Sequence, residues 1–152
     1  MLMAMFRYSM ENILNVKIKI EEQKKMELAK AMMDQKMELE KQEAIKAELD
    51  ITIEVFRERQ KLSQSVSEFQ RLSHNVNYYE KAHKAQKQVV LKAEALVEKR
   101  RKALQKALEE KQIQEKLREK ALNIFLEEEK YKEIKILDEI VGFRYSKKSD
   151  EE

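Results

Sequence analysis

The sequence of 152 residues contains no proline and a single glycine, Gly142. Average usage would place roughly seven prolines and ten glycines in a chain of this length. Proline and glycine are the residues that most strongly interrupt helices and form turns. A chain nearly free of both is therefore expected to form long helices. Charged residues make up 40% of the sequence. The remaining apolar side chains are enough for a narrow seam between helices but not for a deep core.

Two apolar stripes with the three-four spacing of a helix run along the chain, and each predicts a helix with one packing face. The first stripe comprises Ile13, Val16, Ile20, Leu28, Ala31, Leu39, Ile45, Leu49 and Phe56. The second comprises Val66, Phe69, Leu72, Val76, Tyr79, Val89, Ala93, Leu96, Leu104, Leu108, Leu117, Ala121, Ile124, Tyr131, Ile134, Leu137 and Val141. Lys24, Gln35 and Gln42 interrupt the first stripe, so packing there is expected to be weak.

The break between the two helices is expected at Leu62–Ser67, an uncharged stretch. Ser65 and Glu68 have the spacing of a capping box, in which the hydroxyl and the carboxylate satisfy backbone amides at a helix start. A second candidate break, Ser73–Asn77, would divide the chain more evenly.

The sequence therefore predicts an all-α fold, a long antiparallel two-helix coiled-coil hairpin that forms a single domain over residues 1–152. Helix one is expected at about 5–62, the turn at about 62–67 and helix two at about 67–143. Gly142 is a plausible residue to end helix two, and the polar tail 146–152 is expected to be disordered.

Catalytic chemistry is not expected. One glycine cannot supply a phosphate-binding loop or a dinucleotide fingerprint. His74 and His83 are nine residues apart, which places them on opposite faces of one helix, so they cannot share a metal. A two-helix fold offers no pocket in which the pKa values of paired carboxyls would be separated. We therefore expect no enzyme activity, no catalytic residues, no cofactor, no metal and no small-molecule substrate.

The charge pattern argues against a nucleic-acid partner, because 32 basic and 29 acidic residues are interleaved along the chain. The basic run Lys99–Lys102 spreads around the helix and is interpreted as a solvated surface. The apolar start, Met1–Phe6, is too short for a signal sequence, and no apolar run is long enough to cross a bilayer. Together with the absence of cysteine, these features favour a cytoplasmic protein.

Several segments resemble the flagellar type III export protein family FliJ. The opening Phe6-Arg7-Tyr8-Ser9-Met10-Glu11-Asn12-Ile13-Leu14-Asn15-Val16-Lys17, with Glu21 and Glu22, is similar to the aromatic, apolar and lysine-glutamate start of that family. A serine-containing break, an aromatic segment ending in Glu80-Lys81-Ala82, and a charged helix closing with Leu137-Asp138-Glu139-Ile140 match its layout. The likeness extends over nearly the whole chain.

The resemblance implies a cytoplasmic export component, peripherally associated with the inner face of the cell membrane through protein partners. Those partners are the hexameric flagellar export ATPase, an export gate membrane protein and escort chaperones. The family binds in the ATPase pore, and the matching positions are Phe6, Leu14, Lys17, Asp138, Glu139 and Arg144. It reaches the gate through positions just after the turn, matched by Tyr79 and Ala82. Asn75 departs from that pattern, because an aromatic residue is expected near this position, and the departure argues against the gate contact.

Two other interpretations share the same composition. One is a coiled-coil stalk protein of a virulence type III secretion system or of a rotary ATPase. The other is a parallel homodimeric spacer without a turn.

Overall fold

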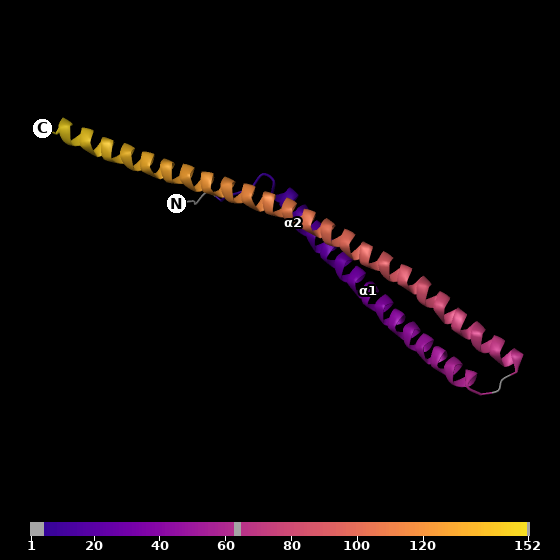
Figure 1. Ribbon diagram of the computed structural model, residues 1–152. Coiled ribbons are helices and arrows are strands. Elements are labelled where there is room, and N and C mark those ends of the chain that lie inside the picture. The colour runs from indigo at the N-terminus through magenta and orange to yellow at the C-terminus, as the bar shows by residue number, and fades with distance from the viewer. Residues whose placement is uncertain (1–4, 63–64, 152) are drawn as a thin grey trace. The chain divides into compact units, whose positions relative to one another are not determined.

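The computed structural model describes residues 5–62 and 65–151, and this part of the chain contains two helices and no strand. Helix α1 spans Glu11–Gln60 and helix α2 spans Val66–Asp150 (Figure 1). The prediction of an all-α fold in which two long helices pack against each other is confirmed.

Contacts divide the chain into two units, each containing part of both helices. The first unit combines the beginning of the chain, as far as Glu21, with the stretch from Ala107 onward. The second comprises Glu22–Lys106 and includes the connection between the helices. A single domain over the whole chain therefore stays a prediction.

The helices run antiparallel within each unit. In the second unit, Arg100 pairs with Glu27 at 3.2 Å, and Gln86 donates a hydrogen bond to Glu38 at 2.7 Å. Residue numbers thus rise along α1 as they fall along α2. The first unit has the same order, because α2 residues 118 and 110 bind α1 residues 11 and 17, respectively. Since α1 pairs with α2 of the same chain, the parallel homodimer without a turn is wrong for this protein.

One set of buried and half-buried residues in each helix recurs at alternating spacings of three and four positions, the repeat of a coiled coil. In α1 they are Leu14, Lys17, Glu21, Lys24, Leu28, Ala31, Gln35, Glu38, Gln42, Ile45, Leu49, Thr52 and Phe56. In α2 they are Leu72, Val76, Tyr79, His83, Gln86, Val90, Ala93, Val97, Arg100, Leu104, Ala107, Lys111, Gln114, Arg118, Ala121 and Phe125. These two sets are called the seam below.

The predicted stripes coincide with the seam in part and miss it by one residue elsewhere. In α1 the stripe members Ile13, Val16 and Leu39 are exposed, and the seam passes through the residue beside each. In α2 Val90 and Val97 are buried in place of the predicted Val89 and Leu96. The cause is that polar residues occupy many seam positions, so the apolar pattern alone does not locate the contact face.

Both outer helix ends differ from the expected bounds. Helix α1 begins at Glu11 instead of about residue 5, after a turn in which the Glu11 amide donates to the Tyr8 carbonyl at 3.1 Å. Helix α2 continues through Gly142 to Asp150, so residues 146–150 of the expected disordered tail are helical. Lys147 and Lys148 in its last turn favour the helix, since cations stabilise the negative end of the helix dipole. Met1–Ala4 and Glu152 lie outside the described residues.

Gly142 sits in an ordinary helical turn of α2, without a positive φ angle and with open space where a Cβ would lie. Gly142→Ala is therefore expected to stabilise this end of α2 locally by about 0.5–1 kcal/mol, because alanine loses less backbone entropy than glycine in a helix. Slower amide hydrogen exchange at residues 138–146 would record the gain. Unchanged or faster exchange would show that the glycine is not a weak point of the helix.

The connection between the helices begins after Gln60 and ends where α2 starts at Val66. Ser63 and Gln64, within the expected turn, lie outside the described residues. Ser65 caps α2, because its hydroxyl accepts a hydrogen bond from the Glu68 amide at 3.3 Å. The Glu68 carboxylate binds Arg59 of α1 at 3.3 Å. The alternative break at Ser73–Asn77 lies inside α2.

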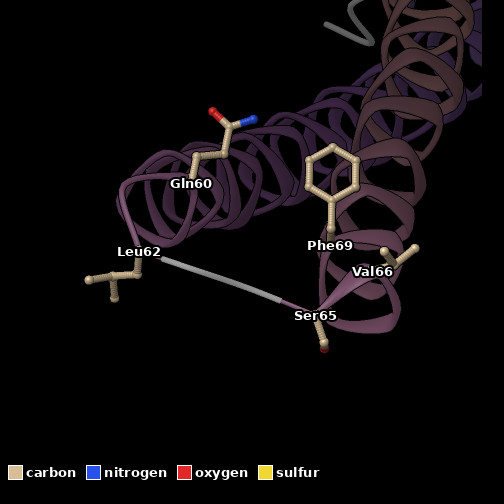
Figure 2. Close-up of a pocket in the computed structure, with 5 residues that line it drawn as sticks. All are labelled: Gln60, Leu62, Ser65, Val66 and Phe69. Carbon is tan, nitrogen blue, oxygen red and sulfur yellow. The ribbon is translucent and has the colours of Figure 1, made fainter.

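An aromatic contact packs the two helices together beside this connection. The rings of Phe56 and Phe69 lie 5.5 Å apart between centroids. Figure 2 shows the Phe69 ring rising from the start of α2, with Leu62 directed away from it. Leu62 and Val66 are exposed, so the loop end of the second unit carries apolar side chains that face solvent.

Candidate partner-binding surfaces

The last part of α2 is an exposed helix rich in apolar residues. Every residue from Tyr131 to Asp150 is exposed. Among them are eight large apolar side chains, whose exposed fractions run from 46% to 78%: Tyr131, Ile134, Ile136, Leu137, Ile140, Val141, Phe143 and Tyr145. Large exposed apolar surfaces often mark sites of contact with other molecules, so this stretch is a candidate binding surface. We call residues 131–150 the C-terminal segment.

The apolar residues of the C-terminal segment lie on two sides of the helix. Ile134, Val141 and Tyr145 are spaced seven and four residues apart and so share one side. Ile136, Ile140 and Phe143 share another, by spacings of four and three. Because each residue turns the helix by about 100°, Ile136 lies about 200° from Ile134, nearly opposite. A partner that covers both sides has to surround the helix.

The six residues matched to the ATPase contact all lie in the first unit. Of these, Asp138, Glu139 and Arg144 are in the C-terminal segment and are exposed. Glu139 and Arg144 lie beside Ile136, Ile140 and Phe143 along a shallow depression. These three charged residues are therefore accessible next to the apolar side chains of the segment.

The other three matched residues are engaged in holding the helices together. Phe6 packs on Phe125 with 5.5 Å between ring centroids, and the Arg118 guanidinium lies 5.7 Å from the Phe6 centroid. Leu14 is 5% exposed. Lys17 binds Glu110 of α2 at 3.0 Å. A role of Leu14 in a ring contact would accordingly act through its position in the seam.

The residues matched to the export gate contact lie in the second unit. Tyr79 is half-buried in the seam, and Ala82 is half-buried beside it in sequence. Tyr78 is 67% exposed, and its ring meets that of Tyr79 edge to face at 5.2 Å between centroids. Asn75, near which the resemblance leads one to expect an aromatic residue, is exposed. The accessible aromatic surface of this region belongs mainly to Tyr78.

A buried ion pair in the first unit was not anticipated from the sequence, where Glu21 reads as a surface residue of a charged helix. Its side chain is 4% exposed and accepts a hydrogen bond from the Lys111 ammonium group at 2.9 Å. The Lys111 side chain is 21% exposed. The seam position of both residues explains the burial, and a heptad count that admitted polar residues would have found them.

Two carboxyl groups of the second unit have a lowered pKa because they accept hydrogen bonds near the seam. The Gln86 amide, which donates to the Glu38 carboxylate and to the Glu38 carbonyl, is the main cause at Glu38. For Glu27, the main cause of the lowered pKa is the hydrogen bond from Lys24, with a further contribution from the charge of Arg100. Of these contacts, Gln86 with Glu38 and Arg100 with Glu27 join α1 to α2.

The histidines show no clustering with other metal-binding side chains. His74 is exposed, and His83 is half-buried in the seam. Within the described residues, no group of three or more His, Cys, Asp or Glu could hold a metal ion. No helix in residues 5–62 and 65–151 is both long and apolar enough to cross a membrane.

Comparisons with known proteins agree with the helix pair. The solved structure of a putative YscO homolog, CT670, from Chlamydia trachomatis is similar, with a TM-score of 0.79 and 19% sequence identity. The similarity covers 97% of this chain and 100% of that chain, and at this identity it shows the fold alone. No curated protein sequence matches the chain. A family model described as flagellar FliJ protein matches residues 6–150. The chain therefore belongs to the FliJ family of coiled-coil proteins of type III export.

Proposed function

We propose that this protein is a non-enzymatic component of the flagellar type III protein export apparatus that binds in the pore of the hexameric export ATPase. The observation that carries the proposal is the exposed C-terminal segment with apolar residues on opposite sides. A ring of subunits surrounds whatever enters its pore, so it can bury both sides at once. A partner with one flat surface would leave the apolar residues of the other side in water. Their burial would then contribute nothing to binding.

The same binding would promote assembly and activity of the ATPase. A segment that contacts several subunits together binds the assembled ring more tightly than it binds separate subunits. By mass action, such a ligand shifts the equilibrium toward the hexamer. Asp138, Glu139 and Arg144 would contact ring subunits directly, whereas Phe6, Leu14 and Lys17 would hold α1 against α2 near the ring.

A second contact is proposed with the export gate membrane protein, through Tyr79 and Ala82. Both side chains are partly accessible, and the exposed Tyr78 ring extends the surface. Escort chaperones are the remaining proposed partners. The protein would act in the cytoplasm, at the inner face of the cell membrane. The match to the flagellar family supports this system over a virulence type III secretion system or a rotary ATPase.

The test is ATPase turnover over a range of export ATPase concentrations, with and without the full chain. The chain is expected to lower the subunit concentration that gives half-maximal turnover, because it favours the hexamer, and to comigrate with the ATPase on a sizing column. Its effect should shrink at ATPase concentrations at which the hexamer is already complete. Unchanged turnover at every concentration, without comigration, would contradict the proposal.

A further inference from the structure

Helix α2 carries a lysine-rich face in the second unit. The residues at successive spacings of three or four are Lys81, Lys84, Gln88, Lys92, Ala95, Lys99, Lys102 and Lys106, and all eight are exposed. We call this set the lysine face. At 1.5 Å per residue it is about 37 Å long. Within residues 5–62 and 65–151, the ion pairs formed by lysines involve none of its six lysines.

The lysine face points away from α1. Val90 and Val97 are buried in the seam, and Lys92 and Lys99 each follow one of them by two residues. Two residues correspond to about 200° of rotation, so these lysines project nearly opposite to the contact with α1. Arg100 of the basic run, in contrast, turns toward α1 and pairs with Glu27. The basic run is thus divided between the seam and the lysine face.

Charge is unevenly distributed over the second unit. Residues 81–106 contain nine basic and two acidic residues, a net charge of +7. The α1 part of the same unit, residues 22–60, contains eight basic and ten acidic residues, a net charge of −2. A negatively charged surface would therefore attract the α2 side of this unit and repel the α1 side, which orients it.

We propose that the lysine face binds the anionic surface of a lipid bilayer directly. A line of lysines along one side of a helix can approach a plane with all members at once, and each lysine near an anionic leaflet adds to the attraction. Two further exposed residues lie on the same side of α2, because Leu91 and Glu98 follow Lys84 by seven and fourteen residues. One apolar side chain, Leu91, is too little to insert the helix into a bilayer, so the face binds at the surface and its binding depends on salt.

The composition of the face favours a membrane over other anionic partners. Protein interfaces are depleted of lysine and rich in aromatic residues, whereas this face has six lysines with Gln88 and Ala95. Phosphates of a nucleic-acid duplex follow a winding path, so a straight line of lysines meets few of them. This contact goes beyond the proposed function, in which the protein reaches the membrane through protein partners, and does not depend on it.

The test is co-sedimentation of the full chain with vesicles of phosphatidylcholine alone, or mixed with phosphatidylglycerol, at low and high salt. Binding is expected for the mixed vesicles at low salt and is expected to be lost at high salt. The variant Lys84→Gln/Lys92→Gln/Lys99→Gln should lower the partition coefficient about 100-fold, from about fivefold for each lysine.

The matched control is Lys30→Gln/Lys36→Gln/Lys46→Gln, which removes three exposed lysines from α1 of the same unit. Its net charge equals that of the lysine-face variant. It should retain binding within a fewfold of the unchanged chain, with equal helix content by circular dichroism. Equal loss of vesicle binding in both variants would show that binding depends only on the net charge of the protein, and would overturn the proposal. So would absence of binding to the mixed vesicles at low salt, or preferential binding of duplex DNA or an acidic protein that displaces the vesicles.

Discussion

The Lys111→Met variant is expected to have a free energy of unfolding about 3 kcal/mol below that of the unchanged protein, at the lower end of the cost of breaking a buried ion pair. Methionine keeps the length and flexibility of the side chain but withdraws the cation that lies 2.9 Å from Glu21. The Glu21 carboxylate is 4% exposed, so water cannot readily replace that cation. Urea denaturation followed by circular dichroism measures the difference.

The double variant Glu21→Leu/Lys111→Met distinguishes two causes of lost stability: loss of the ion pair itself, and burial of the unpartnered Glu21 charge that Lys111→Met leaves. Replacing both partners by apolar residues removes the cost of keeping two charges from water, and such replacements are often neutral or stabilising. The double variant should therefore be more stable than Lys111→Met alone. If Lys111→Met unfolds like the unchanged chain, or if the double variant is the less stable of the two, the pair is not what stabilises this part of the seam.

Lys17→Met is the matched control in the same unit. Its partner Glu110 lies at a similar distance, 3.0 Å, but the side chains are 29% and 37% exposed. An ion pair with this much access to water contributes only about 0–1 kcal/mol, so the control should differ little from the unchanged protein. The contrast between the two lysines tests burial as the cause, since residue type and substitution are the same.

The fold class could be predicted because it depends on features that hold over the whole sequence. A chain with no proline and one glycine has few places to turn, and the uncharged stretch beside Ser65 combines a break with a helix-start signal. The cap at Ser65 is local, since donor and acceptor are three residues apart. Such contacts are encoded in adjacent residues and need no knowledge of the partner helix.

The seam could not be placed from apolar spacing, because several of its positions hold polar residues that pair with side chains of the opposite helix. Glu38 occupies a seam position since Gln86 of α2 donates to it, and Glu21 does so since Lys111 lies opposite. Neither pairing is visible until the register of the two helices is known. Where an apolar residue stands beside a polar one, as Leu39 stands beside Glu38, the apolar pattern selects the wrong neighbour.

Because polar residues occupy seam positions, the sequence alone revealed the partner-binding surfaces only in part. Apolar residues displaced from the seam become exposed, as Met26 and Met33 do at 73% and 67%. The family resemblance pointed to charged residues of the C-terminal segment, such as Asp138 and Arg144. The structure adds that the apolar residues around them are exposed, which is the stronger reason to expect a contact there.

Two double variants of the C-terminal segment are expected to weaken binding of the export ATPase at least tenfold each. One is Ile134→Gln/Val141→Gln, and the other, on the nearly opposite side, is Ile136→Gln/Ile140→Gln. Burying an aliphatic side chain contributes about 1.5–3 kcal/mol, so losing two should cost well over the 1.4 kcal/mol that corresponds to a tenfold change in affinity. Glutamine favours helix, so the segment should stay folded.

The pattern of the two losses distinguishes a surrounding ring from a partner with one contact face. All four residues are between 46% and 62% exposed in the free protein, so their replacement should leave its stability unchanged. A ring buries both sides, and both variants should then lose affinity to a similar extent. A single flat partner or one partner helix buries one side, so only one variant should be affected.

Met26→Gln/Met33→Gln, in the second unit, makes an equal change at two exposed apolar residues and should bind the ATPase normally. Equal, undiminished binding by all three variants would remove the C-terminal segment from the contact.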